Sequence, residues 1–347
     1  MSDAYLRHYE GKKVLITGGA GAIGSNLTRA IAGLGADTVM VLDDLSAGYE
    51  WNIPGLPNVL FIKGSVTDET ALKHVFALKP DVVFHLAAFF ANQNSVDYPQ
   101  RDLMVNGLGT LLVYQYAQLS GTERVVYASS GCSIYGSQAP LPLKEDFTSL
   151  NLTTPYQITK MLGELYANFF AHQYGTKIVK TRFFNSYGPG EVPGQYRNVI
   201  PNFIYYAMLG RPLPITGDGE ATRDFTYVGD IVDALLRAGH LDEAVGEAMN
   251  IASAREIKIG WLAERINELV GNEAGLLRAP ARTWDTKYRL LASIDKAKDL
   301  LGYEPHMDFE TGLAATVEWF RDNWDSIKRD AEFPPGSSAA AKGVTVR

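Results

Sequence analysis

The sequence of 347 residues contains a single cysteine, Cys132, which excludes an internal disulfide and a cysteine-based metal site. Its six histidines show no HxH or HxxxH spacing, so a histidine-based metal site has no support either. No run of about 18 apolar residues is present, and the first residues are polar and charged rather than arranged as a signal peptide. We therefore expect a cytoplasmic protein that binds no metal.

Positive charge is also scarce. The chain carries 32 Lys and Arg against 39 Asp and Glu, a formal net charge of -7, and its basic residues form no run. Because nucleic-acid binding needs several phosphate contacts, we expect no nucleic-acid partner. Because no long apolar run is present, we also expect no membrane association. The 46% hydrophobic content is enough to bury a full core, in one large or two unequal domains.

Glycine, by contrast, is concentrated after a short apolar run at residues 14–17, where Gly18, Gly21 and Gly24 form a GxxGxxG motif. Gly18 allows a tight turn from strand to helix, Gly21 lets the backbone approach a pyrophosphate, and Gly24 permits close packing of the helix. Taken alone, the motif also fits an ordinary packing turn. Its context favours a dinucleotide site, because the next strand, 38–42, ends at Asp43. A carboxylate there accepts hydrogen bonds from an adenosine ribose and repels a 2'-phosphate, which favours NAD over NADP.

The rest of the chain alternates between short apolar runs and helical patterns. This alternation predicts an α/β fold with a Rossmann-type doubly wound parallel sheet. The expected strands are 14–17, 38–42, 59–62, 82–88, 124–130, 177–183 and 247–251. Expected helices include one that ends at Leu78, one over 101–120 and one over 156–174.

Tyr156 and Lys160 stand four residues apart at the start of the last of these helices. Residues i and i+4 share one face of a helix, so the phenol and the ammonium can enter one pocket. A lysine there favours the phenolate and makes the tyrosine a general acid or base for a hydroxyl that loses hydride. The alternative is a common pair on a solvated helix face, and the rest of the chain must decide.

Three further positions each leave two interpretations. The segment that holds Asn94 and Ser95 is either turn chemistry or a site that recognises sugar hydroxyls. His85 is interpreted as a core or strand-end residue rather than a ligand. Cys132 is either packing or an acid/base beside the substrate.

Several motifs occur in a fixed order along the chain. They are Gly18-x-x-Gly21-x-x-Gly24, His85-Leu86-Ala87-Ala88, Asn106-x-x-Gly109-Thr110, Ser129-Ser130 before Tyr135-Gly136, Tyr156-x-x-x-Lys160, and the segments 182–190 and 217–228. In this order they resemble the extended short-chain dehydrogenase/reductases. The match, from about residue 12 to 325, is similar to the nucleotide-sugar branch of the NAD-dependent epimerase/dehydratase family, near its UDP-glucose 4-epimerase-like members.

This resemblance implies a tightly held NAD that takes hydride from C4 of a nucleotide hexose while Tyr156 removes the proton of the 4-hydroxyl. Lys160 would hold the nicotinamide ribose and lower the pKa of Tyr156. Ser130 would hydrogen-bond the same sugar oxygen, with Ser133 as the alternative because the loop 131–134 is one residue longer than usual. Inversion then needs only that the 4-keto sugar turn and accept hydride on its other face.

The resemblance also assigns binding residues. For the cofactor they are Gly18, Gly21, Ala22, Ile23, Gly24, Asp43, Asp44, Ser46, Gly48, Ser65, Val66, Leu86, Ala87, Ala88, Asn106, Ser129, Tyr156, Lys160 and Phe183. For a substrate, most simply a UDP-hexose, they are Asn94, Ser95, Ser130, Ser133, Tyr156, Asn185, Asn198, Val199, Ile215, Arg223, Arg282 and Asp285. Two positions depart from the family: Ser65 replaces an aspartate near adenine, and Phe90 replaces a cofactor-contacting lysine. Arg289 is either a surface salt bridge or a phosphate or uronate contact.

Sibling chemistries differ in the loop after Ser130. A 4,6-dehydratase would carry Asp-Glu there and a uronate decarboxylase a Glu, and neither carboxylate is present. C4 epimerisation is therefore the main hypothesis. The alternatives are a decarboxylase or dehydratase that uses Cys132 or a distant carboxylate, and a non-catalytic NAD-binding or sensing protein.

The expected organisation is an NAD-binding domain over 1–185 that also receives 228–252, and a nucleotide-sugar-binding lobe from 186–227 and 253–330. We expect residues 331–347 to be a disordered tail. The helices over 101–120 and 156–174 have apolar residues on more than one face. From the resemblance we expect them to pair across a homodimer.

Overall fold

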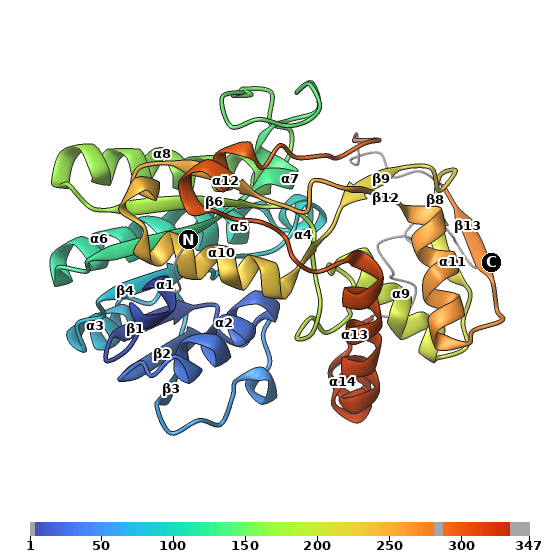
Figure 1. The fold of residues 1–347 in the computed structure, drawn as a ribbon, viewed down its shortest axis with the longest axis horizontal. Coiled ribbons are helices and arrows are strands. Elements are labelled where there is room, and N and C mark those ends of the chain that lie inside the picture. Colours follow the sequence, from blue (N-terminus) through green and yellow to red (C-terminus); the bar gives the residue numbers. More distant parts are fainter. Residues whose placement is uncertain (1–3, 281–286, 334–347) are drawn as a thin grey trace.

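A seven-stranded sheet forms the centre of the protein (Figure 1). The structure is a computed structural model, and it describes residues 4–280 and 287–333. The strand order is β3-β2-β1-β4-β5-β6-β11, and all of its pairings are parallel. The strands are β1 (Lys13–Thr17), β2 (Thr38–Asp43), β3 (Val59–Lys63), β4 (Val82–His85), β5 (Arg124–Ser130), β6 (Ile178–Phe183) and β11 (Ala248–Ile251). This is the predicted doubly wound fold, and the strand order reverses direction between β1 and β4.

Helices cover both faces of this sheet, as buried parallel strands require. One face packs against α1 (Ala4–Arg7), α2 (Ala22–Gly33), α10 (Val228–His240) and α12 (Asp295–Leu301), and the other against α3 (Glu69–Ala77), α6 (Thr110–Ser120) and α8 (Pro155–Tyr174). Alternate residues of β1 belong to the two cores, Val14 and Ile16 to the first and Leu15 to the second. Short elements in the connections are η1 (Glu50–Asn52), α4 (Asn92–Asp97), α5 (Pro99–Asp102), α7 (Gly131–Ile134) and η3 (Asp242–Ala244).

Two expected elements differ from the structure. The strand predicted over 82–88 ends at His85, because the chain then crosses Gly18 so closely that a Cβ there would lie 2.7 Å from the Ala87 nitrogen. The helix predicted over 101–120 consists of α5, a wider π-helical turn η2 (Leu103–Gly109), and α6. Two glycines, which favour the helix weakly, lie in that turn.

The helix that carries Tyr156, α8, has well-defined ends. Thr154 and Gln157 form a capping box, in which the Thr154 hydroxyl accepts from the Gln157 backbone and the Gln157 amide accepts from the Thr154 backbone. Pro155 occupies the first turn, and Gly175 ends the helix in a left-handed conformation. These local signals fix the register of Tyr156 and Lys160 at the first two turns.

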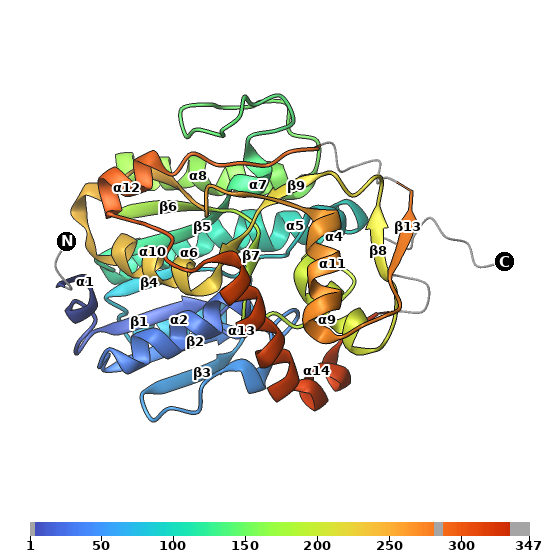
Figure 2. The ribbon, with the colours of Figure 1, turned by 45° about the vertical axis from the view of Figure 1, so that its right-hand side comes forward.

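The remaining elements form a smaller lobe beside the carboxyl ends of the strands, clearest in Figure 2. They are β7 (Ser186–Tyr187), α9 (Val199–Met208), β8 (Leu213–Thr216), β9 (Thr222–Asp224), β10 (Thr226–Tyr227), β12 (Glu256–Lys258), α11 (Ile259–Val270), β13 (Leu276–Ala279), α13 (Phe309–Asp322) and α14 (Trp324–Asp330). A separate hydrophobic cluster lies between α9, α11 and α13. On this basis we propose the two-domain division expected from the sequence.

Part of the predicted tail packs on this lobe. Glu332 pairs with Gly194 in a β-bridge, and the Phe333 ring stacks on Tyr205 with ring centres 5.3 Å apart. The tail expected over 331–347 therefore begins after these contacts at the earliest, and residues 334–347 lie outside the described residues.

Candidate active site

A cavity of about 470 Å³ lies where the sheet strands end and the lobe begins. Most of the predicted cofactor residues line it: Gly18, Gly21, Ala22, Ile23, Gly24, Asp43, Asp44, Ser46, Gly48, Ser65, Val66, Leu86, Ala87, Ala88, Ser129, Tyr156, Lys160 and Phe183. So do the predicted substrate residues Ser130, Ser133, Asn185, Asn198, Val199 and Arg223. Open α/β sheets bind ligands at this edge, at the point where the strand order reverses.

The glycine-rich turn forms a backbone cradle at one end of this cavity. Gly18 has a φ of +74°, a left-handed conformation that favours glycine. A Cβ on Gly24 would lie 2.2 Å from the Gly18 carbonyl oxygen, so the start of α2 lies directly on the turn. The first turn of α2 thus lines the cavity, and a helix N-terminus with its free backbone amides fits a diphosphate.

Asp43 lies beside this cradle, at the end of β2. Its carboxylate accepts from the backbone amides of Ala20 at 3.0 Å and Leu45 at 2.8 Å. Burial raises the pKa of Asp43, and these two hydrogen bonds oppose the rise. A carboxylate can accept further hydrogen bonds on its remaining lone pairs, so the fixed Asp43 fits a ribose diol. The cradle and this carboxylate together match the two ends of an adenosine diphosphate.

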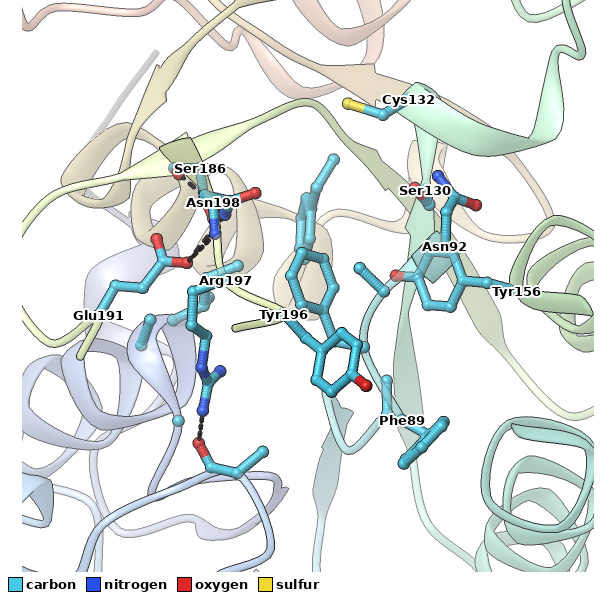
Figure 3. Close-up of a pocket in the computed structure, with 18 of the residues that line it drawn as sticks. Phe89, Asn92, Ser130, Cys132, Tyr156, Ser186, Glu191, Tyr196, Arg197 and Asn198 are labelled. Atoms are coloured by element: carbon cyan, nitrogen blue, oxygen red, sulfur yellow. Dashed lines mark hydrogen bonds between the residues drawn. The ribbon is translucent and has the colours of Figure 1, made fainter. Parts of the chain in front are cut away.

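Tyr156 and Ser130 meet at the opposite side of the cavity (Figure 3). Burial raises the pKa of Tyr156, the charges of Cys132 and Asp102 raise it further, and a hydrogen bond with the Ser130 side chain lowers it. The structure thus places Ser130, rather than Ser133, on the phenol. An acid/base with an adjacent hydroxyl can act on one substrate oxygen from two directions.

Lys160 lies below this pair, buried, with its Nζ donating to the Ala128 carbonyl at 2.8 Å. The Nζ is 5.7 Å from the centre of the Tyr156 ring. We expected this ammonium to lower the pKa of Tyr156, but in the protein alone the pKa is raised, first by burial, and Lys160 is not among the groups that shift it. The same burial lowers the pKa of Lys160 to about 8.

Asp102 supplies the counter-charge to Lys160. Its buried carboxylate accepts from the Thr159 hydroxyl at 2.7 Å and from the Asn106 amide at 2.8 Å. It also raises the pKa of Lys160 against the effect of burial. The junction of α5 and η2 therefore holds a negative charge against the helix that carries the acid/base.

Asp102→Asn is expected to move the alkaline limb of the pH profile of kcat/KM to lower pH. Lys160, with a pKa of about 8, loses its proton as the pH rises, and removing the Asp102 charge makes that loss easier. The profile should be measured beside that of Asp146→Asn, which removes an exposed carboxylate that does not line the cavity and should leave the limb in place. If the alkaline limb of Asp102→Asn lay at the same pH as in the wild type, or at a higher pH, this carboxylate would not act on Lys160.

A buried ion pair supports the end of β5. Arg182 donates from Nε and one terminal nitrogen to Glu164, at 3.0 and 2.8 Å, and the Ser129 hydroxyl donates to Glu164 at 2.5 Å. Arg182 also donates to the Tyr135 hydroxyl at 2.9 Å. Ser129 thus lines the cavity while its hydroxyl donates to Glu164. This hydrogen bond joins the end of β5 to α8.

The loop after Ser130 carries Cys132, whose sulfur faces the cavity (Figure 3). Burial raises the pKa of Cys132 to about 12, and Lys287 lowers it in part. The Lys287 Nζ donates to the Cys132 carbonyl at 2.7 Å. A thiol with that pKa is neutral near pH 7, so Cys132 is a poor base in the protein alone.

The lobe brings polar residues to the substrate side. Asn185 donates to the Asp224 carbonyl at 3.2 Å, and the Asn198 amide donates to Glu191 at 3.0 Å. Arg289 forms a bidentate pair with Glu256 on an exposed surface and does not line the cavity, which favours the salt-bridge interpretation. The predicted Arg282 and Asp285 lie outside the described residues.

Four predicted site residues do not line the cavity. Asn94 donates to the Phe90 carbonyl, and Ser95 donates to Asn92 and accepts from the Tyr156 backbone amide, so this segment is turn and helix chemistry. Asn106 brackets the backbone of Phe89 with two hydrogen bonds and so shapes the wall from behind. Ile215 is fully buried in β8, between Pro214 and Thr216, which do face the cavity.

Other lining residues were missed. Glu191, Tyr196 and Arg197 enter the cavity from the segment between β7 and α9, and Lys287 enters from beyond β13. No periodicity or motif singles out these positions, because loop geometry alone brings them to the site.

Comparison with known proteins agrees with this geometry. A profile of the NAD dependent epimerase/dehydratase family matches residues 14–252. The chain belongs to this family. The cradle, Asp43 and the start of the Tyr156 helix line the cavity of a member of this family, and NAD is the cofactor that the family uses.

Three similar family members indicate the range of chemistry. An epimerase structure from the methanogen Methanothermobacter thermautotrophicus is 56% identical, with a TM-score of 0.94, and the match covers 95% of this chain and 98% of that one. A UDP-glucose 4-epimerase of Mycolicibacterium smegmatis is 34% identical over 89% of this chain and 99% of the relative. A UDP-N-acetyl-alpha-D-glucosaminuronate decarboxylase of Bacillus cytotoxicus is 34% identical over 90% and 98%.

Two further features are absent from residues 4–280 and 287–333. Within them, no helix is both long and apolar enough to cross a membrane, and no three or more His, Cys, Asp or Glu residues are grouped as a metal site requires.

Proposed function

We propose that this protein is an NAD-dependent epimerase that inverts C4 of a UDP-hexose. The observation that carries the proposal is the contact of Tyr156 with Ser130, the last residue of β5, followed by a segment, 131–136, that contains no carboxylate. An epimerase needs a single acid/base at the sugar oxygen, whereas a dehydratase needs further acids and bases at C5 and C6. The cytoplasmic location expected from the sequence is part of the same proposal.

The proton transfer falls to Tyr156. Its ionised phenolate oxygen takes the proton of the sugar 4-hydroxyl as hydride leaves C4 in the first half-reaction, and the phenol returns that proton to the same oxygen in the second, while Ser130 hydrogen-bonds that oxygen. NAD, when bound, supplies the acceptor and then the donor of the C4 hydride, together with a positive charge. Lys160 holds a second positive charge below the ring and favours the ionised phenol.

The rest of the substrate falls to the lobe. Arg223 suits a diphosphate, because a guanidinium can bind two oxygens at once. Asn185 also lines the cavity and hydrogen-bonds the carbonyl of Asp224, the residue after Arg223. Asn198 and Val199, at the start of α9, face the remaining part of the cavity and suit the nucleotide base. With the nucleotide held by this lobe, the 4-keto sugar could turn and accept hydride on either face while its O4 stays beside Tyr156.

Nuclear magnetic resonance of the product tests this function directly. The enzyme is incubated with UDP-glucose, UDP-N-acetylglucosamine and UDP-glucuronate, and formation of the C4 epimer of at least one is expected. If none of these or of other nucleotide sugars gives a C4 epimer, the proposal fails.

A uronate decarboxylase is the second candidate, favoured by the thiol of Cys132 beside Tyr156 and by the similar decarboxylase. It predicts release of carbon dioxide from a UDP-uronate and loss of that release in Cys132→Ser. In a 4-epimerase, Cys132→Ser keeps turnover and no carbon dioxide appears.

We also propose a homodimer, as expected from the sequence. Apolar side chains are exposed along η2, α6 and α8, with Leu165 56% and Phe169 47% exposed on one face of α8. The others are Leu103, Met104, Leu108 and Leu119. Such a stripe along two neighbouring helices suits a self-complementary interface.

Leu165→Glu is expected to convert the dimer to a monomer, because a carboxylate would be buried against its own symmetry mate. Light scattering after gel filtration gives the mass. Leu150→Glu changes a fully exposed loop leucine, 98% accessible, and should leave the dimer intact. A monomeric wild-type protein, or a dimer that survives Leu165→Glu, would contradict this interface.

A further inference from the structure

The segment 189–198, called the strap below, runs from the lobe across the cofactor side of the cavity. Its first part lies on the cradle: the Asn26 amide donates to the Pro189 carbonyl at 2.8 Å, and the Asn52 amide donates to the Gly190 carbonyl at 2.7 Å. A Cβ on Gly190 would lie 3.1 Å from the Ala22 carbonyl oxygen. The strap is therefore in contact with the first turn of α2, where the diphosphate is expected.

The far part of the strap is also anchored. Gly194 exchanges two hydrogen bonds with the Asn202 side chain, at 2.9 and 3.0 Å, and the Gln195 amide donates to the Glu332 carbonyl at 3.1 Å. The Tyr196 hydroxyl donates to Asp97 of α4 at 2.9 Å, on the other side of the cavity. A ligand on the cradle would thus lie beneath a bridge that is fixed on both sides.

Arg197 is the charged residue of this strap. Its guanidinium crosses the cavity and donates to the Ala47 carbonyl (Figure 3). Ala47 adjoins the cradle, because the next residue, Gly48, packs on Ala20 so closely that a Cβ there would lie 2.8 Å from the Ala20 Cβ. The guanidinium therefore lies beside the cradle, on the side where Asp43 stands.

The charges around Arg197 are negative. Burial raises the pKa of Asp43 and of Glu191, and Arg197 is among the charges that lower both. A buried oxygen of Glu191 has no hydrogen-bond partner. A diphosphate placed between two such carboxylates would be repelled unless a cation stood beside it.

The other cations that line the cavity belong elsewhere among the described residues. Lys160 contacts β5, Lys287 contacts the Cys132 loop, and Arg223 lies in β9 of the lobe. Within ranges 4–280 and 287–333, Arg197 is thus the lining lysine or arginine that reaches the cradle side.

We propose that Arg197 binds the diphosphate of NAD and that the strap holds the cofactor in place. The inference rests on the NAD-dependent function proposed above. On binding, the guanidinium would leave the Ala47 carbonyl or share its donors with a phosphate oxygen, since it has five N–H groups. The lobe that binds the sugar nucleotide would then also control release of the cofactor.

Release of labelled NAD from the loaded, full-length protein tests this inference. Arg197→Met is expected to release NAD about 10- to 100-fold faster than the wild type, the range for a lost charge-assisted hydrogen bond. Arg197→Lys, which keeps the charge but not the planar fork, should fall between them. The matched control is Arg29→Met, an exposed arginine of α2 outside the cavity, which should release NAD at the wild-type rate.

Binding of smaller ligands separates a phosphate contact from a general loss of structure. Arg197→Met should weaken ADP-ribose as much as NAD and leave adenosine, which has no phosphate, within about twofold of the wild type. Equal loss for adenosine, or unchanged release of NAD, would overturn the inference. Because no sugar is used, wild-type protein that binds NAD but epimerises nothing would refute the proposed function and leave this inference standing.

Discussion

Tyr156→Phe is expected to lower kcat for C4 epimerisation by about 10²- to 10⁴-fold, the range for loss of a positioned acid/base. The change removes one oxygen and leaves the ring, which packs edge-on against Phe90 at 6.0 Å between centres. Ser130 would remain at the site, but a serine hydroxyl cannot take a proton at neutral pH. Turnover should be measured with the best substrate of the nucleotide-sugar panel, at saturating NAD.

The control for this variant is Tyr166→Phe, two turns or more along α8 and outside the cavity. It should keep wild-type turnover. NAD binding should be unchanged in both variants, since the phenol oxygen faces the substrate side. If Tyr156→Phe retained full biological function, the non-catalytic NAD-sensing alternative would be favoured.

Arg182→Leu is expected to lower the free energy of unfolding by about 3–5 kcal/mol, because it leaves the Glu164 carboxylate buried without its partner. Arg182 also holds the Tyr135 hydroxyl, which in turn donates to Asn250 of β11 at 2.7 Å. The substitution should therefore weaken contacts both at the end of β5 and at β11, the last strand of the sheet. Chemical denaturation of the purified protein measures it.

Lys258→Leu gives the matched comparison. Its ion pair with Glu220 lies on the surface, with both side chains more than half exposed, and should contribute less than about 1 kcal/mol. A stability of Arg182→Leu close to that of Lys258→Leu would mean that Glu164 becomes protonated or solvated without penalty. Arg182→Leu with Glu164→Leu, which removes both charges, should recover much of the loss.

The sequence predicts the cofactor half of the site well, because that half is built from local pattern. Gly18 and Gly24 are dictated by a turn whose backbone leaves no room for a Cβ, and Asp43 by the end of a strand. Tyr156 and Lys160 need only the register of one capped helix. Each of these signals lies within a few residues of the group that it places.

The substrate half depends on contacts between distant segments, which local pattern does not encode. Ile215 and its neighbours alternate in and out of β8, so a one-residue difference separates core from cavity. Arg197 reaches the cradle from a segment that Asn26 and Asn52, more than 130 residues earlier in the chain, hold by hydrogen bonds. Likewise the pKa of Tyr156 depends on how much protein covers it, and spacing alone predicted the opposite direction.

The contacts of Asp330 and Glu332 bear on the order in which the site is completed during synthesis. Asp330 accepts from the Trp51 indole at 2.7 Å, and Glu332 accepts from the strap. Chains fold from their N-terminal part as they leave the ribosome, so the cradle and Asp43 are made early. The residues of the cradle are therefore synthesised well before Glu332, which hydrogen-bonds the strap. The strap, already held by Asn26, Asn52 and Asn202, gains its contact with Glu332 only after α14 has been made.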